Sequence, residues 1–156
     1  MRSEQSLRLS VRDSEDMTVM SSLLQDSVIS VSDMSYLSGE NRFVLVANRF
    51  LWESAGELDD FPHSFPNFGR VLCGVCFENV RSVRQKGLNR KIKNQIVSLL
   101  SVSLSDKCQI DLVFSAGISV RLEVSDLFCH LQDINEPWPT DARPTHGVDS
   151  LPVGER

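Results

Sequence analysis

Polar and apolar residues alternate over much of the second half of the chain, which is the pattern of half-buried β-strands. Residues 100–104, 110–116 and 118–124 each carry an apolar side chain at every second position. Ala116-Gly117 stands between the last two segments and predicts a tight hairpin. We therefore expect consecutive antiparallel strands here, each with one face in the core and one face in solvent.

The first half of the chain predicts further strands that are less regular. Residues 7–11, 28–31, 43–52, 71–77 and 80–85 have the apolar and β-branched content that is typical of strands. Turn residues and polar loops separate them along the chain. With the three segments above, these runs predict a meander of antiparallel strands.

Two amphipathic helices are expected, one near each end of the chain. Asp13 or Ser14 can cap the first, and Ser125 can cap the second. Proline at 137 and 139 would end the second helix. Apolar residues recur at helical spacing in both: Met17, Met20, Leu23 and Leu24, then Leu127, Phe128, Leu131 and Ile134.

These elements together predict an α+β fold built on a curved antiparallel sheet. A sheet of this kind forms a partly closed barrel or a sandwich, and the C-terminal helix would cap one open end. Seven strands followed by a helix is also the order of pleckstrin-homology-like domains, so we include that topology as a candidate. We expect a single globular domain over residues 1–146 and a disordered tail over residues 147–156.

Composition limits the class of protein. The chain has 156 residues and a net charge of −5, with 41% hydrophobic and 24% charged residues. These values exclude a fully disordered chain and a generic nucleic-acid coat protein. The N-terminus has no apolar signal region, and the longest apolar run, residues 43–47, is too short to span a membrane. We expect a cytoplasmic protein with no membrane span, whose cysteines are free thiols.

Positive charge is concentrated in the middle of the chain. Residues 70–93 hold 7 basic residues and 1 acidic residue, a net charge of +6, whereas the segments on both sides are acidic. A solvated loop balanced by acidic neighbours would explain this, and so would a surface that faces an anionic partner. The candidate binding residues are Arg81, Arg84, Lys86, Arg90, Lys91 and Lys93.

The four cysteines give no pattern that specifies a metal or redox site. Cys73 and Cys76 form a CxxC, but they fall inside a predicted strand, where residues three apart point to opposite faces. No second ligand pair follows at zinc-site spacing. Cys108 and Cys129-His130 could be brought to the pair by the fold. We expect buried structural cysteines, with no metal and no cofactor.

Motifs of catalysis are also missing from the sequence. The chain has no GxSxG, HExxH, GxGxxG or P-loop pattern, so we assign no catalytic residue. An unrecognised hydrolase or thiol enzyme that uses Cys129, His130 or His63 is kept as a third hypothesis.

Several strings resemble a small bacterial family of unknown function. The most specific is Asn-Arg-Phe-x-Trp-Glu within residues 42–53, although the central position here is Leu51. Residues 70–72, 77–80 and 83–88 and the Trp138-x-Thr140-x-x-Arg143-Pro144-x-His146 ending are similar too. The resemblance extends from about Leu7 to His146. It implies a stand-alone cytosolic domain, and it implies no activity, cofactor or catalytic residue.

The leading functional hypothesis is a non-enzymatic binding module. Residues 81–93 would be its recognition surface, for a protein partner or for a second copy in a homodimer. Binding of nucleic acid or a phosphate group by the same surface is the second hypothesis. Nucleic-acid binding has weaker support, since the basic segment offers only Phe77 as a stacking platform.

Overall fold

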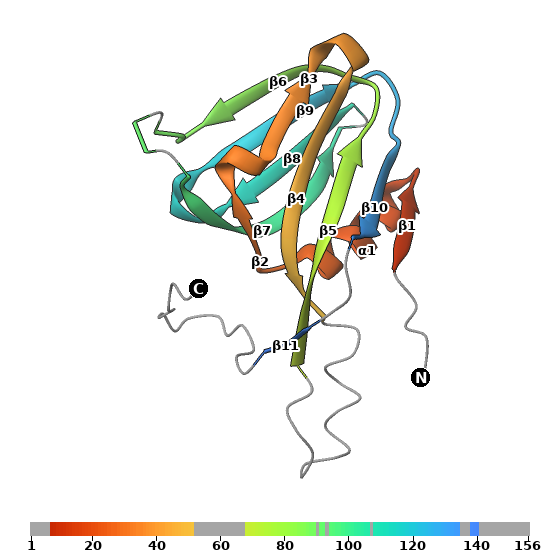
Figure 1. Cartoon of the computed structure of the whole chain (residues 1–156). Coiled ribbons are helices and arrows are strands. Elements are labelled where there is room, and N and C mark those ends of the chain that lie inside the picture. The colour runs from red at the N-terminus through yellow and green to blue at the C-terminus, as the bar shows by residue number, and fades with distance from the viewer. Residues whose placement is uncertain are drawn as a thin grey trace.

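The computed structural model describes residues 7–51, 68–89, 91–92, 94–106, 108–134 and 138–140. These residues contain one α-helix and eleven strands, and the strands form a single antiparallel sheet (Figure 1). The helix is α1, Ser14–Leu24, and short 3-10 turns occupy Val31–Asp33, Ser38–Glu40 and Ser115–Gly117. The strands are β1 Arg8–Val11, β2 Ser27–Ser30, β3 Met34–Leu37, β4 Arg42–Phe50, β5 Phe68–Phe77, β6 Val80–Lys86, β7 Ile96–Ser105, β8 Gln109–Phe114, β9 Ser119–Val124, β10 Cys129–Asp133 and β11 Trp138–Thr140.

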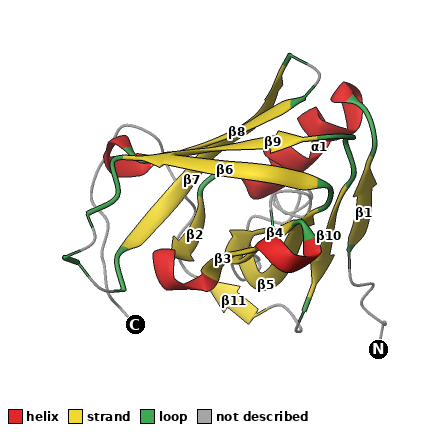
Figure 2. Ribbon diagram, turned by 90° about the horizontal axis from the view of Figure 1, so that it is seen from above, coloured by secondary structure: helices red, strands yellow, loops and turns green. Residues whose placement is uncertain are grey.

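The sheet is curved but not closed. Its strand order is β1-β10-β5-β4-β2-β7-β8-β9-β6, with β3 also paired to β4 and β11 also paired to β5. Seen from above, β6, β8 and β9 form one layer across from β3, β4 and β5 (Figure 2). β1 and β6 are the two ends of this order, and each pairs with one strand in the described part of the chain.

Apolar side chains from both layers meet in one core, and α1 contributes to it. Met17, Met20 and Leu24 of α1 are buried, as the helical spacing predicts. The Asp13 side chain caps the helix by accepting a hydrogen bond from the backbone N–H of Asp16, 2.8 Å away. Strands β8 and β9 carry the alternation predicted for residues 110–114 and 118–124, and the Ser115–Gly117 turn joins them. In β7 the register shifts between Leu99 and Ser101, so Leu100, which was expected to face inward, is 43% exposed, whereas Val102 is buried.

The prediction of a C-terminal helix is wrong, so the fold is mainly β rather than the expected α+β arrangement. Residues 129–133 form β10, which lies between β1 and β5. Cys129, Leu131 and Asp133 face inward, whereas His130 and Gln132 are more exposed. The pleckstrin-homology-like order needs a helix after its seventh strand, and the described residues contain none there. Strands β3 and β11 were not predicted.

A buried ion pair explains why the period of β10 is hidden in the sequence. Arg49, on β4, has no exposed surface, and the side chain of Asp133 is 7% exposed. Two hydrogen bonds of 3.1 Å join the Arg49 guanidinium to both oxygens of Asp133. The backbone N–H of Leu7 also donates to Asp133, at 3.1 Å. Because this carboxylate occupies a core position, the strand does not show a regular apolar alternation.

None of the helices in the described residues has the length and apolar character needed to cross a bilayer. The predicted domain end at residue 146 and the predicted tail over 147–156 lie outside the described residues. Those two statements stay predictions.

Candidate functional site

The basic segment begins as a strand at one end of the sheet rather than as a loop. β6 carries Arg81, Arg84 and Lys86, all exposed, and pairs with β9. The register shifts between Val80 and Ser82, so Arg81 lies at a bulge. Lys86 was expected in a loop, but it is the last residue of the strand.

Arg84 and Lys86 line a shallow hollow on the solvent face of strands β6 to β9. Arg84 lies directly opposite Arg121 of β9, and Lys86 lies opposite Ser119. The hollow has a volume of about 590 Å³. Its lining residues are Arg84, Gln85, Lys86, Ser103, Asp111, Val113, Ser119, Val120 and Arg121.

Asp111 neutralises one of the three cations in this hollow. The Arg121 guanidinium donates to both oxygens of Asp111, at 2.7 and 3.2 Å. This hydrogen bonding holds the pKa of the Asp111 carboxyl below its ordinary value, although partial burial opposes the shift. Within the described residues no carboxylate pairs with Arg84 or Lys86. The hollow therefore presents two uncompensated positive charges.

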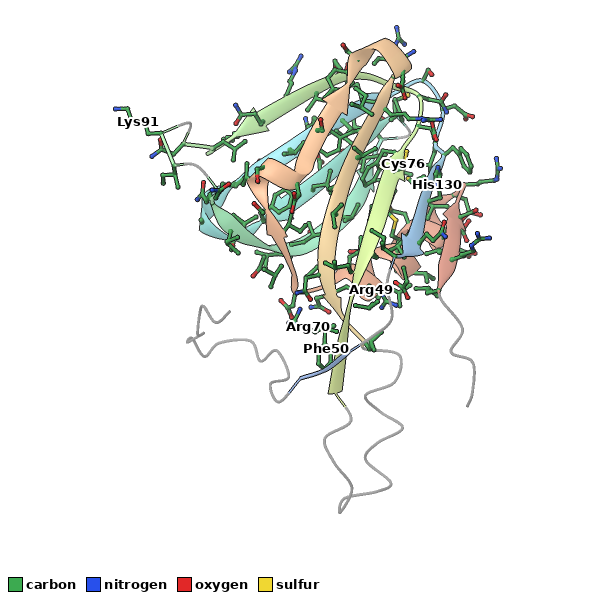
Figure 3. The ribbon with its side chains drawn as sticks, in the orientation of Figure 1. Arg49, Phe50, Arg70, Cys76, Lys91 and His130 are labelled. Atoms are coloured by element: carbon green, nitrogen blue, oxygen red, sulfur yellow. The ribbon has the colours of Figure 1, made fainter. Side chains whose placement is uncertain are left out.

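The remaining basic candidates do not line this hollow. Lys91 is exposed in the turn beyond β6, where its backbone N–H donates to the Asn89 side chain at 2.9 Å. Figure 3 shows Lys91 at the far side of the molecule from Cys76 and His130. Arg90 and Lys93 lie outside the described residues. The structure thus brings together Arg84 and Lys86 and adds Arg121, which was not predicted.

A second polar cluster lies where β5 and β10 pair. Cys76 of β5 is directly opposite His130 of β10, and Glu78 follows β5 two residues after Cys76. His130 Nε2 lies 3.0 Å from Glu78 Oε2, and Cys76 Sγ lies 3.5 Å from the same oxygen. Figure 3 shows Cys76 and His130 side by side on the two strands. The three ligand-type atoms all lie within 4.8 Å of one another.

Arg42 of β4 fixes the other oxygen of the Glu78 carboxylate. Its Nε donates to Glu78 Oε1 at 2.9 Å, and its NH1 group donates to Glu40 at 3.2 Å. The hydrogen bonds from His130 and Arg42 hold the pKa of Glu78 below its ordinary value, against the effect of partial burial. Glu78 is therefore a carboxylate at neutral pH, with Oε2 directed at Cys76 and His130.

Cys76, in this cluster, and Cys129, which precedes His130, are poor nucleophiles because both thiols stay protonated at neutral pH. Desolvation, helped by the charge of Glu78, raises the pKa of Cys76 to about 11. Burial raises the pKa of Cys129 to about 12. A reactive cysteine needs a lowered pKa, so the raised pKa of Cys129 disfavours a thiolate mechanism through this residue. His63, the other residue of the enzyme hypothesis, lies outside the described residues.

The CxxC geometry agrees with the sequence prediction, but the cluster itself was missed. Cys73 is buried and Cys76 is partly exposed, because they point to opposite faces of β5. Cys108 is exposed rather than buried. The spacing of Cys76 and Glu78 puts both on one face of an extended chain, which was a usable signal. The pairing of β5 with β10 supplies His130, and no local pattern predicts that pairing.

Comparison with known proteins gives a family and no function. A family model described as a protein of unknown function (DUF2948) matches residues 7–146. This range agrees with the extent of the resemblance noted from the sequence strings. No curated protein and no solved structure matches the chain.

Proposed function

The chain belongs to DUF2948, a family of unknown function, and we propose that it is a non-enzymatic module that binds an acidic protein surface. The observation that supports this most is the pair of uncompensated cations, Arg84 and Lys86, beside the hollow on β6 to β9. Like charges directly opposite each other, as in Arg84 and Arg121, destabilise a sheet. Asp111 already offsets the charge of Arg121, so an anionic partner would mainly compensate the charges of Arg84 and Lys86.

The chemistry of the hollow favours a protein over a nucleic acid. Val113 is 38% exposed and lies among the lining residues, so the lining combines an exposed apolar side chain with charged and hydroxyl groups. This is the usual composition of a protein interface. Among the described residues no aromatic side chain lines the hollow, whereas binding of single-stranded nucleic acid normally uses aromatic stacking platforms.

Charge reversal on β6 tests the proposal. We expect the immobilised full chain to capture an acidic protein from lysate of its own organism, and Arg84→Glu with Lys86→Glu to weaken this by tenfold or more. A tenfold loss corresponds to about 1.4 kcal/mol in total, or roughly 0.7 kcal/mol for each reversed charge. Arg8→Glu on β1 is the matched control, since Arg8 is an exposed arginine on the strand at the other end of the sheet order.

The same experiment separates the competing partners. Equal capture by the wild type and the double variant would contradict the proposal. Recovery of the chain itself would identify a homodimer. If the captured material is nucleic acid, its affinity should fall steeply with salt, and the second hypothesis would replace the first.

A further inference from the structure

We propose that Cys76, Glu78 and His130 form a binding site for a divalent transition-metal ion, with zinc as the best match. The three residues offer one thiolate sulfur, one carboxylate oxygen and one imidazole nitrogen. Zinc accepts this mixture of ligands, whereas calcium and magnesium prefer oxygen alone. The site is separate from the basic hollow on β6 to β9, so the two proposals stand or fall independently.

The spacing of the three atoms fits a tetrahedral ion. A sulfur at about 2.3 Å and nitrogen or oxygen ligands at about 2.0–2.1 Å from zinc, at tetrahedral angles, lie about 3.3–3.6 Å apart. Cys76 Sγ and Glu78 Oε2 are already 3.5 Å apart. His130 Nε2 is 3.0 Å from Glu78 Oε2 and within 4.8 Å of the sulfur, so a small movement of the ring would complete the geometry. The His130 side chain is 42% exposed, which leaves room for that movement.

Neighbouring groups hold the ligands in place. Cys76 and His130 are attached to paired strands, so their backbones are fixed relative to each other. Arg42 holds Glu78 Oε1 at 2.9 Å and thereby leaves Oε2 for the ion. Carboxylate ligands are commonly oriented by such outer hydrogen bonds. Phe128 lies beside the His130 ring, with 5.4 Å between the ring centroids.

The site would keep one coordination position open. Cys129, the nearest other thiol in sequence, is buried on the opposite face of β10, so the described residues supply three ligands. Three protein ligands with a water in the fourth position is the arrangement of open zinc sites. On binding, the Cys76 thiol would lose its proton to solvent and ligate as the thiolate.

Metal titration of the full chain tests the site. We expect the metal-free protein to bind one equivalent of Co²⁺ with a thiolate-to-cobalt charge-transfer band, and Zn²⁺ to displace it. Cys76→Ser should abolish the band, and His130→Gln should weaken binding at least tenfold. Cys108→Ser is the matched control, because Cys108 is a free, exposed cysteine outside the cluster, and it should leave both unchanged.

A measurement on the wild type removes any dependence on the folding of the variants. Bound zinc should slow alkylation of Cys76 at mildly alkaline pH and leave Cys108 unaffected. Zinc at 100 times its dissociation constant should also raise Tm by on the order of 5 °C. The proposal is overturned if the wild type shows no saturable binding, or if Cys76→Ser and His130→Gln bind as the wild type does.

Discussion

Cys76 and His130 are directly opposed across the β5–β10 pair, and both approach the same oxygen of Glu78. In the sequence they lie far apart, and the CxxC that contains Cys76 does not indicate that His130 lies beside it. The pairing of two strands thus creates a three-residue cluster on a solvent-accessible face. The opposite side of the same strands buries Cys73 and Cys129 in the core.

The raised thiol pKa predicts slow reaction of Cys76 with iodoacetamide. With a pKa of about 11, only about a thousandth of this thiol is ionised at pH 8, and the thiolate is the reactive form. Its rate should keep rising with pH until about pH 11. Mass-resolved alkylation of the metal-free chain measures this rate for each cysteine, and fast labelling of Cys76 at neutral pH would contradict the assigned environment.

The raised pKa of Cys76 also predicts how the stability of the fold changes with pH. The folded state holds the Cys76 proton to a higher pH than the ordinary value of 9.0 for an unfolded thiol. In that window the folded state binds more protons, so the free energy of unfolding falls as pH rises from about 9 to 11. Urea unfolding of the wild type and Cys76→Ser should show a smaller alkaline loss in the variant.

Breaking the Arg49–Asp133 pair should strongly destabilise the fold. Asp133→Asn leaves the guanidinium of Arg49 buried without its bidentate carboxylate, and such losses cost about 3–5 kcal/mol. Denaturant unfolding measures the change. Replacing both residues with apolar ones, as in Arg49→Met with Asp133→Leu, should recover a large part of the loss. A cost below about 1 kcal/mol for Asp133→Asn would contradict the assigned role of the pair.

Gly87 fixes the end of β6, so its substitution should also destabilise the protein. Its φ is +87°, and a Cβ there would collide with the carbonyl oxygen of Gly117 in the β8–β9 turn. We expect Gly87→Ala to cost on the order of 3 kcal/mol. Gly39→Ala is the control, because a Cβ at Gly39 meets no atom within 4 Å. Equal thermal stability of the two variants would show that this close approach is unimportant.

The charges of the hollow can be increased as well as reversed. Asp111→Asn would release Arg121 from its ion pair and leave three uncompensated cations around the hollow. We therefore expect tighter binding of the acidic partner, by on the order of threefold to tenfold. A calorimetric titration compares the variant with the wild type. Weaker binding by a stable variant would indicate that Asp111 itself contacts the partner.

Arg84→Glu separates binding from folding. A glutamate at position 84 would lie opposite Arg121, and an opposite-charge pair across strands stabilises a sheet by about 0.2–1 kcal/mol. The variant should therefore be at least as stable as the wild type in denaturant unfolding while binding its partner more weakly. A loss of stability in this variant would contradict the cross-strand arrangement.

How far the sequence predicts this fold depends on how local each signal is. Strands β7 to β9 follow from period-two alternation, and α1 follows from its apolar stripe and the Asp13 cap. β10 was mistaken for a helix because Leu127, Phe128 and Leu131 match helical spacing, while the inward Asp133 breaks the strand pattern. Its ion pair with Arg49 joins distant segments, and no pattern within either strand reveals it.

The candidate sites, too, could be predicted from the sequence only where their signal is local. The basic segment is visible in the sequence because its positive charges lie within a few residues of one another, and β6 does carry Arg84 and Lys86. The hollow also needs Arg121 and Asp111 from two other strands. Whether Arg84 stays uncompensated depends on cross-strand register, which a bulge shifts between Val80 and Ser82.

Site-specific photo-crosslinking is the decisive measurement for the proposal that the solvent face of β6 to β9 binds a protein. Val113 of β8 is 38% exposed and lines the hollow, and Ser10 is exposed on β1 at one end of the sheet order. With a photo-crosslinking amino acid at each position in turn, we expect a discrete adduct with an acidic protein at position 113 and none at position 10. No protein adduct at position 113, or the same adducts at both positions, would contradict the proposal.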